Sequence, residues 1–131
     1  MCIRDSLGRT MTVQQLAYAM ITTSSNFATN LLVDVVGVST IQTALTELGI
    51  DGVKVVRGVE DQAAFDAGIN NEVTASGLLK LLRVLAEGKA YGEEASAEMV
   101  KILHDQRFKG GIPAGLPQAA RVAHKLSLIH I

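Results

Sequence analysis

Three polar side chains suited to proton transfer and hydrogen bonding adjoin one another at Ser24, Ser25 and Asn26, between two amphipathic stretches. A hydroxyl group donates and accepts hydrogen bonds at once, so it can relay a proton, and an amide can orient a substrate carbonyl. Serine and asparagine are also the usual residues at helix N-termini. The triplet therefore predicts a helix junction, which is catalytic only if other groups converge on it.

A second set of candidates lies between residues 58 and 73, a stretch with no sustained helical or strand period. It contains Glu60, Asp61 and Asp66, each able to act as a general base. The alternative is that they are solvated loop carboxylates. Because long loops without a period are often functional, we predict a compact surface loop that carries a functional group.

Apolar residues at helical spacing predict five helices, over about 13–21, 26–36, 40–48, 75–87 and 93–106. Thr12 with Gln15, and Ser39 with Gln42, have the spacing of capping boxes, and Thr74 is placed to cap the fourth helix. Gly37 is placed to end the second helix in a left-handed cap. The chain is therefore predicted to be mainly helical.

The remaining segments are short. Val53–Arg57 is a β-branched run that predicts an extended segment. Residues 109–117 contain both prolines and break any helix, and residues 121–125 alternate like the start of a strand. His104, near a predicted helix end, is expected at the surface. His124 is expected to point away from Lys125, because strand neighbours alternate faces.

Three motifs in order resemble the class A β-lactamases and their penicillin-recognising relatives. They are Met11-Thr-Val-Gln-Gln-Leu16 followed by Ile21-Thr-Thr-Ser-Ser-Asn-Phe-Ala-Thr-Asn-Leu-Leu32, the Gly-Ile-Pro-Ala-Gly-Leu-Pro run within residues 108–117, and Arg-Val-Ala-His-Lys at 121–125. In that family a Ser-Asp-Asn triplet sits at a helix junction and a Lys-Thr-Gly motif begins on a strand. The resemblance implies the helical subdomain of an α/β β-lactamase/transpeptidase-like fold, with most of the β-sheet missing.

The resemblance assigns roles to three residues, of which two lie in the triplet and one ends the last motif. Ser24 matches the serine that relays a proton to the leaving nitrogen during acylation. Asn26 matches the asparagine whose amide binds the acyl-amide carbonyl of the substrate. Lys125 matches the lysine that attracts the substrate carboxylate and holds the serine relay. Ser25 stands where the family usually has Asp, which leaves acylation plausible and the rigidity of the junction in doubt.

The resemblance also predicts how the long loop is held. Counting back from Thr74 places Arg57 and Glu72 on an arginine-to-acid ion pair that closes the loop neck in β-lactamases. The same count places the glutamate that activates the deacylating water at position 59, which is a valine here. Glu60 follows one position later in the sequence. Asn30 matches the helix asparagine that orients this glutamate. We take Glu60 as the candidate deacylating base, with Asp61 and Asp66 as lesser candidates.

The two ends of the sequence are consistent with a single DNA element translated in opposite directions. Residues 1–6 can be encoded by ATG TGT ATA AGA GAC AGN, and the reverse complement of that string encodes residues 126–131. We identify this element as the transposase mosaic end of sequencing libraries. Residues 7–125 are then a partial serine hydrolase domain. They contain no Ser-x-x-Lys, the nucleophile motif of the family, so we expect it upstream and expect this chain alone to be inactive.

Composition limits the partners. The 131 residues carry 12 Lys and Arg against 13 Asp and Glu, a net charge of −1 that argues against nucleic acid as the main partner. No apolar run is long enough to span a membrane. We predict a β-lactam or related amide as substrate, no cofactor or metal, a monomeric parent, and a periplasmic or secreted location by resemblance. The alternatives are a D,D-peptidase- or esterase-like penicillin-binding relative and a non-catalytic helical binding module.

Overall fold

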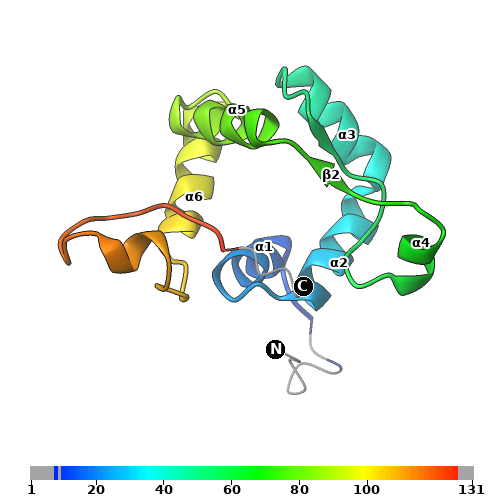
Figure 1. Cartoon of the computed structure of the whole chain (residues 1–131), viewed down its shortest axis with the longest axis horizontal. Helices are drawn as coiled ribbons and strands as arrows, with labels where there is room; N and C mark the ends of the chain where they lie inside the picture. The colour runs from blue at the N-terminus through cyan, green and yellow to red at the C-terminus, as the bar shows by residue number, and fades with distance from the viewer. Residues whose placement is uncertain (1–7, 9, 127–131) are drawn as a thin grey trace.

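The computed structural model describes residue 8 and residues 10–126, which form a mainly helical chain (Figure 1). The elements in order are α1 (Val13–Thr22), α2 (Asn26–Val36), α3 (Val38–Glu47), β1 (Val53–Lys54), α4 (Gln62–Asp66), β2 (Glu72–Val73), α5 (Ala75–Ala86), α6 (Glu93–His104) and the 3-10 helix η2 (Ile112–Gly115). The five predicted helices are confirmed. The short helix α4, inside the long loop, was not predicted. Most of the terminal segments predicted to be adapter translations, residues 1–6 and 127–131, lie outside the described residues.

Side-chain caps fix where two of the helices begin. The Thr12 hydroxyl accepts from the Gln15 backbone at 3.1 Å, and the Gln15 side chain accepts from the Thr12 backbone at 2.9 Å. This confirms the predicted capping box of α1. The Thr74 hydroxyl accepts from the Gly77 backbone at 3.0 Å and caps α5, as predicted.

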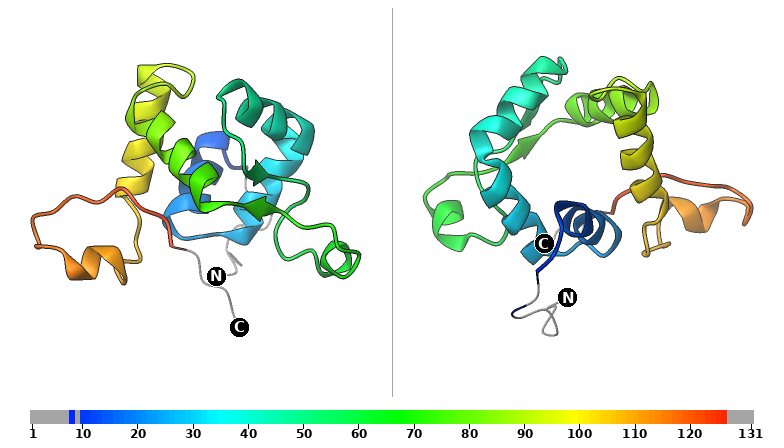
Figure 2. Two further views of the ribbon diagram at one scale, coloured as in Figure 1. Left: turned by 45° about the horizontal axis from the view of Figure 1, so that its top comes forward. Right: turned by 180° about the vertical axis from the view of Figure 1, so that it is seen from behind.

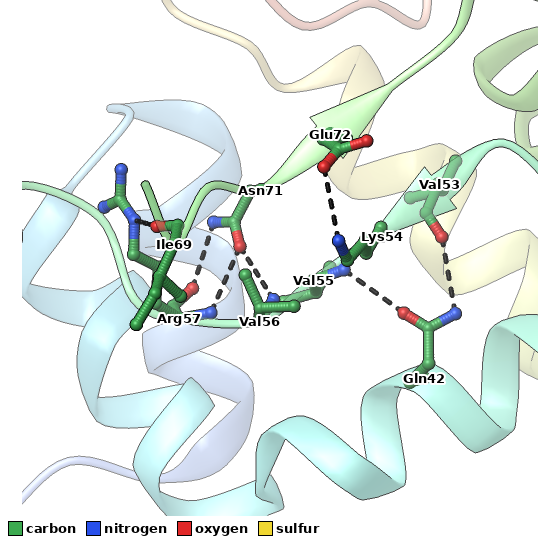
Figure 3. Close-up of polar contacts among 9 residues, drawn as sticks. All are labelled: Gln42, Val53, Lys54, Val55, Val56, Arg57, Ile69, Asn71 and Glu72. Carbon is green, nitrogen blue, oxygen red and sulfur yellow. Dashed lines mark hydrogen bonds and ion pairs between the residues drawn. The ribbon is translucent and has the colours of Figure 1, made fainter. Parts of the chain in front are cut away.

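The capping box predicted at Ser39 is wrong. Helix α3 begins at Val38, and Gly37, with φ 83° and ψ 136°, is both the last cap of α2 and the first cap of α3. Because Gly37 turns the chain in one residue, Ser39 lies inside the helix. The Gln42 side chain instead binds the backbone of Val53 and Val55, at 3.4 and 3.2 Å (Figure 3).

The sheet of the described residues is limited to one antiparallel pair. Val53 pairs with Val73, and Lys54 pairs with Glu72. Among the described residues, the strand predicted at 121–125 does not form, because no described strand pairs with it. These residues instead pass the C-terminal end of α6 (Figure 2).

The helices follow one another around a ring. Helices α2 and α3 form one side, α5 and α6 form the other, and α1 packs against both α2 and α6 (Figures 1 and 2). The loop that carries α4 projects on the α2 side, and residues 109–120 project as an arch on the α6 side (Figure 2). The α1–α2 junction therefore lies between the long loop and the C-terminal segment.

The buried core is small for a chain of this length. The chain has an accessible surface of 9472 Å², whereas a compact monomer of 13.9 kDa exposes roughly 6,700 Å². Large apolar side chains are exposed on several helices, among them Phe27, Val35, Leu78, Leu79 and Leu82. The described residues thus leave apolar helix faces uncovered, which agrees with a helical subdomain that lacks most of its sheet.

Membrane-spanning potential is limited to one bent pair of helices. Among the described residues no single helix is both long and apolar enough to cross a membrane. Helices α2 and α3 meet that length and composition only when taken together, and they are bent by 82° at the break between them.

Helix α6 is tied to the end of α1 by one fully buried side chain. The Gln106 amide donates to the Ile21 carbonyl at 2.7 Å, and its oxygen accepts from the Phe108 backbone at 3.1 Å. The next backbone N–H, of Arg107, donates to the Thr22 carbonyl at 3.1 Å. Carbonyls at a helix C-terminus lack partners within the helix, so these bonds satisfy groups that would otherwise be buried alone.

We predict that Gln106→Ala lowers the free energy of unfolding by about 2–4 kcal/mol, because it leaves the Ile21 carbonyl and the Phe108 N–H without partners. Urea unfolding followed by circular dichroism measures the change. Gln118→Ala, at an exposed position of the arch, is the control and should change stability by less than about 0.5 kcal/mol. Equal effects of the two substitutions would contradict the assignment.

Candidate functional site

Ser24 lies at the junction of α1 and α2 in an uncommon backbone conformation. It is half-buried and has φ 53°. Within the described residues, Ser24, Glu60 and Tyr91 are the non-glycine residues with positive φ. Such conformations cost about 1–3 kcal/mol and gather at functional sites. Two of these three positions are candidates from the sequence.

Hydrogen bonds hold the junction, although Ser25 stands where the resemblance leads us to expect an aspartate. The buried Ser25 hydroxyl accepts from the Ala28 backbone at 3.2 Å and caps α2. Its N–H donates to the Ala19 carbonyl at 3.3 Å, and its own carbonyl accepts from the Thr29 hydroxyl at 2.9 Å. A serine is therefore sufficient to hold this turn. Asn26 follows as the first residue of α2, with an exposed side chain.

Lys125 reaches Ser24 from the other end of the chain. Its Nζ donates to the Ser24 Oγ at 2.5 Å and to the Leu126 carbonyl at 2.8 Å. Partial burial disfavours the charged ammonium and lowers the pKa of Lys125 below its ordinary value. The structure thus brings together two of the residues that the sequence singled out, which are 101 positions apart.

Asn30 holds the start of the long loop at two points. Its Oδ1 accepts from the Val59 N–H at 2.7 Å, and its Nδ2 donates to the Val59 carbonyl at 3.0 Å. Gly58 permits this close approach, because a Cβ there would lie 2.4 Å from the Asn30 Oδ1. The asparagine therefore binds the backbone at the position that the ungapped count gave to the deacylating glutamate.

The three carboxylates of the loop have different surroundings. Asp61 caps α4 by accepting from the Ala64 backbone at 3.0 Å, and Asp66 accepts from the Gln62 amide at 2.8 Å. Glu60 is exposed, has φ 58° and directly follows the clamped Val59. Of the three, Glu60 is thus the carboxylate next to the clamp.

The predicted ion pair between Arg57 and Glu72 is wrong. Glu72 pairs with its strand neighbour Lys54 at 3.2 Å (Figure 3). Arg57 donates to the Ile69 carbonyl at 2.7 Å and to the Asn70 Oδ1 at 3.2 Å. The register of β1 and β2 sets Glu72 opposite Lys54, so the guanidinium meets the loop backbone three residues earlier in the chain.

Asn71 closes the loop neck in place of that ion pair. Its Oδ1 accepts from the backbone N–H groups of Val56 and Arg57 at 2.8 and 3.1 Å, and its Nδ2 donates to the Arg57 carbonyl at 3.0 Å (Figure 3). A side-chain amide carries both an acceptor and donors, so one asparagine can bind several backbone groups. The Asn70-Asn71 pair is the sequence feature from which this role could have been predicted.

The two histidines differ in environment. His104 is half-buried at the end of α6. His124 is 8% exposed, and its ring lies against the carbonyls of Phe108 and Val122. No group of three or more His, Cys, Asp or Glu side chains within the described part of the chain is placed to hold a metal ion.

Comparison with known proteins identifies the fold and the family. The model of the beta-lactamase enzyme family matches residues 3–129. A beta-lactamase from Sphaerobacter thermophilus is 26% identical, with a TM-score of 0.71 over 82% of this chain and 40% of its own. A class A beta-lactamase from Bacteroides cellulosilyticus is 20% identical, with a TM-score of 0.79 over 94% of this chain and 46% of its own.

A third solved structure is a leucine-to-glutamate mutant of PBP-A, as an acyl-enzyme complex with penicillin G. It is 23% identical, with a TM-score of 0.75 over 88% of this chain and 42% of its own. No curated protein matches. The chain thus spans less than half the length of these three structures, and what it shares with them is the helical part of their fold.

We predict that Asn71→Ala loosens the long loop more than Glu72→Gln does. The first substitution removes three hydrogen bonds at the neck, each worth about 1 kcal/mol, and the second removes an exposed ion pair worth about 0–1 kcal/mol. Hydrogen exchange of peptides that cover residues 58–70 measures the difference. Faster exchange in Glu72→Gln than in Asn71→Ala would show that the ion pair closes the loop after all.

Proposed function

Because this chain belongs to the beta-lactamase enzyme family, we propose that it is part of a class A-like serine hydrolase that opens β-lactam amides through an acyl-enzyme. The observation that carries the proposal is the 2.5 Å contact between the Lys125 Nζ and the Ser24 Oγ. A cation bound to a half-buried hydroxyl at a hydrogen-bonded helix junction is an arrangement suited to proton transfer.

The geometry suits Ser24 to relay a proton to the leaving nitrogen. A hydroxyl that accepts a hydrogen bond from an ammonium group keeps its own hydrogen free to be donated. When Ser24 gives that proton away, Lys125 can replace it, and its lowered pKa favours the transfer. Asn26, exposed beside this pair, is the proposed ligand of the acyl-amide carbonyl, and Lys125 also attracts the substrate carboxylate.

The proposed nucleophile is the serine of a Ser-x-x-Lys motif elsewhere in the parent protein. Residues 7–125 contain no such motif, and the solved relatives are more than twice as long as this chain. A relay without a nucleophile has no leaving group to protonate, so this chain alone does not open a β-lactam. Residues 1–6 and 126–131 remain our proposed adapter translations, in place of natural sequence.

The proposed substrate class is β-lactams, which the penicillin G complex of PBP-A supports. We also propose that the parent is a monomer and that it is periplasmic or secreted. Both proposals rest on the family alone. A D,D-peptidase-like penicillin binder is the main rival, because Val59 stands where the ungapped count expects a glutamate. The speed of deacylation separates the two functions.

We propose Glu60 as the deacylating base. Asn30 fixes the backbone of Val59, so the next residue begins from a fixed point. Glu60 is exposed to water and held at positive φ, whereas Asp61 and Asp66 are engaged within α4. A carboxylate held at such a point can orient and deprotonate a water molecule.

In the complete parent protein, we expect Ser24→Ala or Lys125→Ala to lower kcat/KM for a chromogenic cephalosporin by about 10²–10⁴-fold, because each removes one partner of the proton relay. Ser39→Ala, on an exposed turn of α3, is the control and should leave the rate unchanged. Unchanged acylation in both site variants would refute the relay.

Glu60→Gln in the parent should slow deacylation by about 10²–10⁴-fold and leave acylation unchanged, so that the acyl-enzyme accumulates in intact-mass spectra. Asp61→Asn is the matched control, because asparagine caps a helix as well as aspartate does. If the wild type already turns over slowly and Glu60→Gln changes nothing, the parent is a slow penicillin binder.

A further inference from the structure

Lys125 reaches Ser24 on a segment that no strand ladder supports within residue 8 and residues 10–126. The preceding residue, His124, is held instead by contacts with three backbone carbonyls. Its backbone N–H donates to the Leu103 carbonyl at 3.3 Å. Its ring places Nε2 at 3.0 Å from the Phe108 carbonyl and Nδ1 at 3.1 Å from the Val122 carbonyl. His124 is 8% exposed, whereas both neighbours in sequence are exposed.

The acceptor of the Nε2 contact is itself fixed to the Ser24 junction. Phe108 donates its N–H to the Gln106 side chain, which binds the Ile21 carbonyl. Arg107, between them, binds the Thr22 carbonyl. Thr22 is two residues before Ser24. The contacts therefore form a closed circuit, from Ser24 through the end of α1, the segment after α6, His124 and Lys125, and back to Ser24.

We propose that His124 is a positioning residue that sets the Lys125 ammonium against Ser24. The inference rests on the proposed function, in which that ammonium supports the relay and attracts the substrate carboxylate. Extended neighbours point to opposite sides, so a ring held on the α6 side directs the next side chain toward the junction. His124 touches neither the substrate nor the reacting atoms in this account and acts only through Lys125.

An imidazole meets the requirements of this place. It fills a buried site and carries an N–H that can donate to the Phe108 carbonyl, which is 16 residues away in sequence. Phenylalanine has a similar shape and no donor, so it leaves that carbonyl without this partner. Glutamine lacks the ring and keeps an N–H donor. The two substitutions therefore separate the hydrogen bond from the filling of space.

The test measures kcat/KM for penicillin acylation in the complete parent protein, for His124→Phe, His124→Gln, Lys125→Ala and the double variant His124→Phe with Lys125→Ala. We expect His124→Phe to lower the value by about 10²-fold, because a small displacement of a catalytic group has that effect. His124→Gln should retain part of the rate. The double variant should be no slower than Lys125→Ala alone, because His124 acts through that residue.

His104→Phe, at the half-buried histidine of α6, is the control and should leave acylation unchanged. Full activity in His124→Phe, or losses that multiply in the double variant, would overturn the inference while the loss in Lys125→Ala upholds the proposed function. If Lys125→Ala itself acylates normally, the proposed function fails and this inference fails with it. If His124→Phe does not fold, His124→Gln alone and combined with Lys125→Ala gives the same cycle.

Discussion

The last carbonyls of α1 determine where the segment after α6 is held. A helix end needs partners for its carbonyls, and here the Gln106 side chain and the Arg107 N–H supply them to Ile21 and Thr22. These bonds fix the start of the arch against the helix junction. Because the arch returns at His124 to the end of α6, the same bonds determine where Lys125 meets Ser24. The contact between Lys125 and Ser24 therefore depends on the hydrogen bonds that the last carbonyls of α1 accept.

The long loop shows the same preference for backbone partners over ion pairs. Asn71 satisfies three backbone groups at the neck, Arg57 binds the Ile69 carbonyl, and Asn30 binds both polar atoms of Val59. The ion pair between Lys54 and Glu72 is exposed and contributes little by comparison. Amide side chains therefore hold both ends of the segment that presents Glu60.

Local signals in the sequence predicted the five longer helices, the caps at Thr12 and Thr74, and the junction at Ser24, because each depends on residues within one or two turns. The resemblance predicted the contact between Ser24 and Lys125. Hydrophobic periodicity alone could not predict it, because the two residues are 101 positions apart. The roles of Gln42, Asn71 and His124 escaped prediction, because each side chain binds backbone groups distant in sequence. Arg57 and Glu72 were paired wrongly because a count along the chain ignores the register of β1 with β2.

In the proposed parent enzyme, we expect the segment after α6 to bring Lys125 to Ser24 as it does here. A crystal structure of the complete parent protein with a penicillin bound tests it most directly. We expect the Lys125 Nζ in hydrogen-bond contact with the Ser24 Oγ, the His124 ring against the Phe108 carbonyl, and the drug beside both Ser24 and Asn26. A structure with Lys125 turned away from Ser24, or with the drug bound elsewhere, would contradict the account.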